Sequence, residues 1–226
     1  MQQSRLKIKK FRYESCGYVL LAINVSCIKG SAEMEETMGI YEACPVLENE
    51  QLMVRLIQQQ DADDLASVYS DKFALPFFNS DCCHGSNFYC ATKEDVANAI
   101  KYWLIEYHEN KGFVRFSIID KKQNKVVGTI EMFQRKSTDA YDGYGILRID
   151  VRSDYEKTSW IYAILDLIVE PFYEWFACCH IATKAAVYAI DRIEALKKMG
   201  FVQSTKPLLD QHHAIAYYDY WIRQRQ

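Results

Sequence analysis

Two acidic residues lie within segments that otherwise have the pattern of strands. Glu131 belongs to the largely apolar segment 126–133, and Asp150 belongs to the segment 146–151, where apolar and charged residues alternate. A carboxylate held on a strand can take a proton from a substrate, directly or through a water molecule. The alternative for each residue is an ordinary solvated or ion-paired acid. Glu131 and Asp150 are therefore candidate catalytic bases.

The segment after Asp150 is a second candidate site, because a polar turn at 152–157 leads into a helix. Exposed N–H groups at a helix N-terminus bind anions, usually phosphates. The turn contains no glycine, and most units of this kind are structural only, so both interpretations stay open. The helix is predicted by apolar residues three or four positions apart. They are Ile161, Ile164, Leu165, Ile168 and Phe172.

Further elements on both sides of this turn must hold it in place. We expect Pro171 to kink or end the long helix. A strand at 180–185 follows, and then a short helix that Asp191 caps and Gly200 ends. The other predicted elements are a strand at 52–57, a helix from 61, an aromatic-rich loop at 75–90, a helix at 92–107 with a capping box, antiparallel strands at 114–120 and 126–133, and a last strand at 214–223.

Composition limits the class of protein. The 226 residues, 50% hydrophobic and 25% charged, suit one globular domain with a sizeable core. A net charge of −3, with Lys and Arg spread along the chain, predicts no nucleic-acid partner. No apolar run approaches the roughly 18 residues that span a bilayer, so we expect a soluble protein without a membrane role. We expect residues 47–226 to form the domain and residues 1–46 to be an N-terminal extension whose order stays open.

The eight cysteines favour reduced thiols, because adjacent pairs make poor disulfide frameworks. A basic and then apolar order near the N-terminus is broken at Asn24, which argues against an export signal. We therefore expect a cytoplasmic location. Two triplets, Cys82-Cys83-His84 and Cys178-Cys179-His180, contain the ligand types that zinc prefers. Vicinal cysteines rarely both reach one ion, and we expect no metal.

Five short motifs follow one another along the chain. They read LMVRLI at 52–57, DADDL at 61–65, VGTI at 127–130, IDVRSDY at 149–155 and ALKKMGF at 195–201. With these motifs in this order, residues 47–222 resemble the GCN5-related N-acetyltransferase (GNAT) superfamily, especially its ribosomal-protein-acetyltransferase-like branch. The resemblance implies a mixed α+β fold, with a mostly antiparallel twisted sheet of about six to seven strands flanked by helices. It also implies a V-shaped splay between the fourth and fifth strands.

The resemblance further implies acetyl-CoA as co-substrate and direct attack of an amine on its thioester. The amine would belong to a small molecule or a protein. The backbone of Ile149 and Val151 would pair with the pantetheine arm, and the amides of residues 157–161 would meet the pyrophosphate. The implied cofactor-binding residues are Ile149, Val151, Glu156, Lys157, Thr158, Ser159, Trp160 and Ile161. Tyr188, Tyr217 and Tyr218 are further candidates, as proton donors or as packing residues.

The chain departs from the family pattern at the turn. The family has Gln or Arg, two residues, Gly, one residue, and Gly or Ala, whereas this chain reads EKTSWI at 156–161. Glu156 adds negative charge, and Ile161 adds a branched side chain where the family leaves room for a phosphate. Ala189 replaces a usual Asn, and Leu196 stands where a tyrosine acid is found.

Three hypotheses follow from these observations. The first is an acyl-CoA-dependent N-acyltransferase. The second is a catalytically silent GNAT-fold module that binds or regulates. The third is a zinc or thiol-based protein. The identity of the amine and the oligomeric state stay open, with a homodimer among the alternatives.

Overall fold

The structure is a computed structural model that describes residues 39–83, 86–210 and 215–226. The described residues belong to one compact unit, Thr37–Gln226. Most of the predicted N-terminal extension lies outside them, although Ile40 is buried in the core. His84 of the first Cys-Cys-His triplet and Ala214 of the last predicted strand also lie outside. No helix of the described part is long and apolar enough to cross a membrane.

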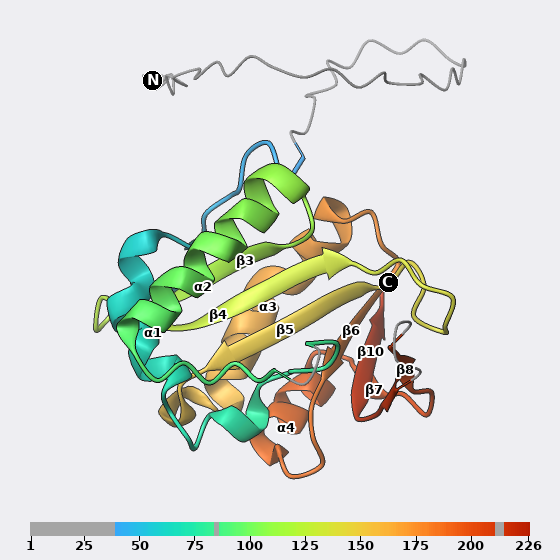
Figure 1. Ribbon diagram of the computed structural model, residues 1–226. Coiled ribbons are helices and arrows are strands. Elements are labelled where there is room, and N and C mark those ends of the chain that lie inside the picture. Colours follow the sequence, from blue (N-terminus) through green and yellow to red (C-terminus); the bar gives the residue numbers. More distant parts are fainter. Residues whose placement is uncertain (1–38, 84–85, 211–214) are drawn as a thin grey trace, which may run out of the picture. The chain divides into compact units, whose positions relative to one another are not determined.

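A mixed sheet of eight strands forms the centre of this unit (Figure 1). Its order is β1-β2-β3-β4-β5-β6-β10-β7, and every pair is antiparallel except β5 with β6. The eight strands exceed the predicted six to seven because β1 and β7 have two residues each, too few to give an alternating pattern. The strands are β1 (Leu47–Glu48), β2 (Leu52–Leu56), β3 (Val114–Asp120), β4 (Lys125–Gln134), β5 (Gly145–Val151), β6 (His180–Lys184), β7 (Val202–Gln203) and β10 (Tyr220–Gln224), with a separate pair β8 (Leu208–Leu209) and β9 (Ala216–Tyr217).

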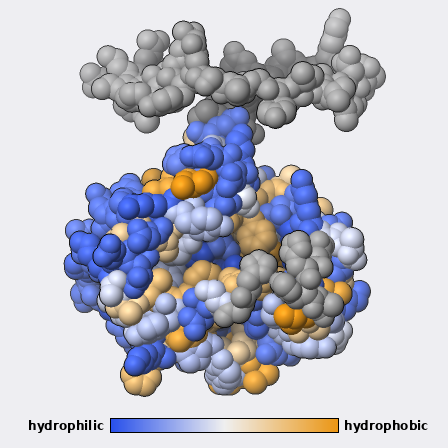
Figure 2. Space-filling view, viewed as in Figure 1, coloured by the Kyte–Doolittle hydropathy of each residue, from blue (hydrophilic) through white to orange (hydrophobic). Residues whose placement is uncertain are grey.

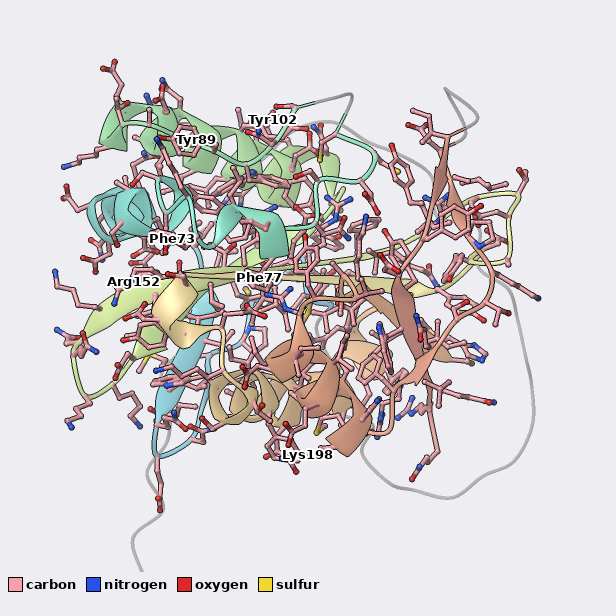
Figure 3. The ribbon with its side chains drawn as sticks, turned by 90° about the horizontal axis from the view of Figure 1, so that it is seen from below. Phe73, Phe77, Tyr89, Tyr102, Arg152 and Lys198 are labelled. Atoms are coloured by element: carbon pink, nitrogen blue, oxygen red, sulfur yellow. The ribbon has the colours of Figure 1, made fainter. Side chains whose placement is uncertain are left out.

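Helices cover both faces of the sheet. Seen edge-on in Figure 3, α1 and α2 lie on one side, and α3 and α4 lie on the other. Two core clusters correspond to these layers, one between the sheet and α3 with α4, and one beneath α1 and α2. The helices are α1 (Ala62–Tyr69), α2 (Lys93–Ile105), α3 (Thr158–Trp175) and α4 (Ile190–Lys198), and short helical turns are η1 (Gln59–Asp61), η2 (Leu75–Phe77), η3 (Glu106–Asn110) and η4 (Ser153–Tyr155).

Local sequence signals account for the two longest helices. Thr92 caps α2, since its side chain accepts from the Asp95 amide while the Asp95 carboxylate accepts from the Thr92 amide. All five residues of the predicted stripe on α3 are buried. Each such side chain contributes roughly 1.5–3 kcal/mol through burial. Both helix predictions are therefore confirmed.

Of the two alternatives for Pro171, an end of the helix is excluded, because α3 continues to Trp175 with Phe172 and Tyr173 fully buried in the core. Two local predictions need correction. The predicted last strand is divided into β9 and β10, since Asp219 has a φ of 65° between them. Asp191 does not cap α4, which begins at Ile190 without a side-chain cap.

Candidate acyl-CoA cleft and acidic site

The sheet opens between β5 and β6. These strands pair in parallel through three residues only, Gly145 with Ile181, Ile146 with Ala182 and Leu147 with Thr183. The rest of β5, residues 148–151, keeps its pairing with β4 and leaves β6. This parting of the fourth and fifth long strands of the sheet is the splay that the resemblance predicts. It leaves one backbone edge of the β5 segment that carries Asp150 without a strand partner in the part of the chain that the structure describes.

The loop after η2, residues 78–83, spans this opening. The Asp81 carboxylate accepts two hydrogen bonds from Lys184 Nζ on β6, at 2.7 and 2.8 Å. It also accepts from the Tyr220 hydroxyl at 3.1 Å, and the Asp81 carbonyl accepts from Arg148 on β5 at 2.9 Å. Asp81 thereby joins β5 to β6 beyond the point where their own pairing ends. We call residues 78–83 the bridging loop.

The N-terminus of α3 already holds an anion from within the chain. The Asp191 carboxylate of α4 accepts from the Thr158 amide at 2.9 Å and from the Thr158 hydroxyl at 2.7 Å. These two hydrogen bonds lower the pKa of Asp191. Asp191 therefore caps α3, 33 residues earlier in the chain, rather than its own helix.

Four of the five amides at 157–161 have partners inside the protein. The Lys157 amide donates to the Tyr155 carbonyl, and the Trp160 and Ile161 amides donate to the Lys157 carbonyl. The Thr158 amide donates to Asp191. An anion that is to bind this turn must therefore compete with Asp191 for the Thr158 amide.

A buried ion pair closes the turn from its other side. The Arg192 guanidinium of α4 binds Glu156 through Nε at 2.7 Å and through a terminal nitrogen at 2.6 Å. Its remaining terminal nitrogen donates to the Phe77 carbonyl at 3.2 Å. Burial works against the charge on Arg192, but Glu156 outweighs it and raises the pKa of Arg192. Arg192 consequently connects α4, the turn before α3 and η2, the element on which Figure 3 labels Phe77.

The side chains of the predicted cofactor residues point largely into the protein. Ile161 is fully buried in the core, so its side chain packs inside the protein. Ile149 and Val151 are buried in the same core cluster and pair with Ile130 and Gly128 of β4. The partly buried Trp160 packs edge-on against Tyr155, with ring centroids 4.7 Å apart. The assignment of these residues to a cofactor stays a prediction.

Strand register assembles a polar layer on the face of the sheet beneath α1 and α2. Arg115 on β3 lies opposite Glu131 on β4, which lies opposite Arg148 on β5. One row further along, Thr129 lies opposite Asp150. Cross-strand neighbours on one face are about 5 Å apart, so a row of this kind brings charges into contact.

Glu131 is held between two guanidinium groups. Arg115 binds one of its carboxylate oxygens, and Arg148 binds the other at 2.9 Å. Burial works against ionisation of Glu131, but the two arginines outweigh it and lower its pKa. Glu131 is thus an ion-pair partner of two arginines, with both oxygens in use.

Asp150 has a different environment. Its Oδ2 lies 3.6 Å from the Arg115 guanidinium and accepts from the Tyr69 hydroxyl at 3.3 Å. Tyr69 is also 2.7 Å from the Thr129 hydroxyl. Oδ1 is buried and has no hydrogen-bond partner among the described residues. Burial raises the pKa of Asp150, and a buried carboxyl group with a raised pKa is a functional-site candidate.

The remaining candidates are scattered. The Tyr188 hydroxyl donates to the Pro76 carbonyl, and Tyr218 is exposed. Cys178 is buried whereas Cys179 is exposed. Within the described residues, no group of three or more His, Cys, Asp or Glu side chains is placed to hold a metal ion.

No protein-family model and no curated protein matches the sequence. Solved structures do match. A ribosomal-protein-S5-alanine acetyltransferase from Vibrio fischeri aligns at 18% identity and a TM-score of 0.57, over 79% of this chain and 94% of that chain. A GNAT-family acetyltransferase from Bacillus anthracis aligns at 14% identity and 0.57, over 80% and 98%. The protein therefore has the fold of the GNAT-family acetyltransferases.

Proposed function

We propose that the protein is an acyl-CoA-dependent N-acyltransferase that moves an acetyl group from acetyl-CoA to an amine. The carrying observation is the parting of β5 from β6 beside Asp150, a buried acid with a raised pKa. In the GNAT fold such an opening is the place expected for the pantetheine arm, as the sequence resemblance implies. The amine belongs to a small molecule or to a protein.

The chemistry requires a base, and Asp150 suits that role better than Glu131. The amine nitrogen attacks the thioester carbonyl carbon, a C–N bond forms, the C–S bond breaks and the CoA thiolate leaves. The amine proton passes to the free Oδ1 of Asp150, directly or through water, and later returns to the thiolate. Both oxygens of Glu131 are engaged by arginines, so Glu131 orients Arg115 instead.

Ligand-dependent melting and a thiol-release assay test this proposal. A ligand at about a hundred times its Kd stabilises a protein by roughly 2.7 kcal/mol, so acetyl-CoA is expected to raise Tm. Asp150→Asn is expected to keep this rise and to lose thiol release over a panel of amines. Glu131→Gln is a less clean comparison, because it leaves two arginines without their carboxylate. No change in Tm at millimolar acetyl-CoA would refute the proposal.

A second candidate function is a GNAT-fold module that binds or regulates without turnover. Asp191 favours it, since the chain's own carboxylate occupies the α3 N-terminus where a pyrophosphate would bind. The Glu156–Arg192 pair favours it as well. This candidate predicts that neither acetyl-CoA nor CoA changes Tm. An acetyltransferase, by contrast, is expected to show a higher Tm with either ligand and to release no thiol until an amine substrate is added.

A further inference from the structure

The Arg115 guanidinium lies between two acids of the polar layer and contacts them unequally. One terminal nitrogen, Nη2, binds the Glu131 carboxylate directly in a buried ion pair. The other, Nη1, lies 3.6 Å from Oδ2 of Asp150, which is beyond hydrogen-bond distance. The cation is therefore shared between Glu131 and Asp150, and Glu131 holds the larger share.

Two hydroxyl groups keep Nη1 of Arg115 from turning toward Asp150. Nη1 donates to the Tyr69 hydroxyl at 3.2 Å and to the Thr129 hydroxyl at 3.1 Å. A terminal guanidinium nitrogen carries two hydrogens, so these two bonds use both of them. Asp150 consequently lies near the charge of Arg115 but accepts its hydrogen bond from the Tyr69 hydroxyl, at 3.3 Å.

The polar layer is closed to solvent, so its charges act on one another strongly. The outer surface of this face mixes hydrophilic and hydrophobic residues (Figure 2), and beneath it Arg115, Glu131 and Asp150 are all buried. A cation that comes within about 4–6 Å of a carboxyl group strengthens the acid by roughly ten- to a thousandfold. The position of one guanidinium therefore decides how firmly Asp150 holds a proton.

Ionisable side chains on several elements act on Asp150. They are Tyr69 of α1, Arg115 of β3, Glu131 of β4, Arg148 of β5 itself and Arg192 of α4. Burial has the largest effect and raises the pKa of Asp150, the three arginines lower it, and Glu131 raises it. Removal of Glu131 would take away a repelling charge and at the same time release Arg115 and Arg148 from their shared partner.

We infer that Glu131 is a positioning residue, which holds the Arg115 guanidinium to itself and so preserves the affinity of Asp150 for a proton. The inference rests on the proposed function only for its catalytic consequence, because the ion pairs are formed within the chain itself. If Asp150 accepts the amine proton, the strength of that base is set from the neighbouring strand, by Glu131.

Glu131→Gln tests the inference, because the amide has the size of the carboxylate but no charge. Arg115 is then expected to pair with Asp150, and the acid dissociation constant of Asp150 is expected to rise by at least about tenfold. Carboxyl-carbon NMR titration of the full chain, labelled at Asp and Glu, measures this constant without acyl-CoA, and Asp150→Asn identifies the signal. Glu131→Asp keeps the charge and is expected to restore most of the wild-type value.

Asp61→Asn is the matched control. It removes another buried, arginine-bound carboxylate, whose partners are Arg55 and Ser117 and which lies outside the contacts of Arg115 listed above. The titration of Asp150 is expected to stay unchanged in this variant. In a thiol-release assay, the acidic limb of the pH profile is expected to move to lower pH in Glu131→Gln and to stay in place in Asp61→Asn.

Three outcomes would overturn the inference. The first is an Asp150 signal that titrates in Glu131→Gln at the wild-type pH or above it. The second is an equal change in Asp61→Asn, which would assign the effect to loosened packing. The third applies even if Glu131→Gln fails to fold: on acidification of the wild-type chain, Glu131 takes up a proton before Asp150. Absence of any acetyl-CoA effect on Tm would instead refute the proposed function and leave the titration result standing.

Discussion

Removing the Asp191 carboxylate is expected to open the α3 N-terminus to acyl-CoA. In the wild-type chain this carboxylate receives both polar hydrogens of Thr158, at 2.9 and 2.7 Å. Asp191→Ala frees the amide and removes a negative charge next to the expected pyrophosphate position. Asp191→Asn removes the charge but keeps an oxygen that can accept the hydrogen bonds, so its effect is expected to lie between wild type and Asp191→Ala.

The size of the effect follows from three terms. An anion at a helix N-terminus contributes about 0.3–1 kcal/mol, and two unit charges about 4 Å apart in water repel by about 1 kcal/mol. Because Asp191 is solvent-exposed, the free energy that each of its hydrogen bonds contributes lies at the lower end of the usual range. A total of about 1–2 kcal/mol corresponds to roughly five- to thirtyfold tighter CoA binding. Loss of the cap is expected to cost the ligand-free protein about 1 kcal/mol.

Calorimetric Kd values for CoA measure this effect at one low ionic strength. Asp166→Ala is the matched control, since it removes an exposed acid that lies in α3 itself, about two turns from the N-terminus of that helix. If Asp191→Ala binds CoA no more tightly than Asp166→Ala, the Thr158 amide is not a phosphate contact and the reasoning fails. Binding that is absent in all of these variants favours the silent module.

Two further predictions concern stability. Ile161→Ala is expected to lower the free energy of unfolding by about 2–5 kcal/mol in urea titrations, because Ile161 is fully buried in the core; a loss under about 0.5 kcal/mol would contradict its placement. Burial alone would raise the pKa of Asp139, but hydrogen bonds from Leu209, Ser137 and Tyr141 and from Arg135 lower it to about 2. Because the pKa of Asp139 is lower in the folded than in the unfolded chain, its ionised carboxylate stabilises the fold at pH values above the unfolded-state pKa near 4. This stabilisation is lost as the pH falls toward 2. Asp139→Asn is therefore expected to cost about 2 kcal/mol at pH 7, and the gap in free energy of unfolding should close between pH 4 and pH 2; a gap that stays constant with pH would refute the assignment.

Local patterns were sufficient for the elements whose partners are close in sequence. The α3 stripe repeats every three or four residues, and the Thr92–Asp95 box spans three positions, so both can be read without knowledge of the fold. The order of these elements and the five motifs then predicted the fold class. Strands of two residues, such as β1 and β7, have no period and could not be predicted.

The candidate site was predictable only in part because its contacts are long-range. Asp150 and Glu131 were identifiable as acids on strands, but their different roles depend on Arg115 and Arg148, which register places beside Glu131. An arginine between apolar residues on β3 was the available signal for Arg115. Nothing local links Thr158 to Asp191 across 33 positions, so an acid that looked like a cap for α4 was assigned to the wrong helix.

The bridging loop has a consequence for the cooperativity of unfolding. Because β5 and β6 share three register pairs, the contacts of Asp81 with Arg148, Lys184 and Tyr220 add to the shared core in joining the β1–β5 half of the sheet to the half formed by β6, β10 and β7. The carboxylate holds Lys184 and Tyr220, and the backbone carbonyl of the same residue holds Arg148 of β5. Asp81→Ala removes the carboxylate contacts and is expected to lower the free energy of opening of β6, β10 and β7 relative to β1–β5, which amide hydrogen exchange would register as earlier exchange in those three strands.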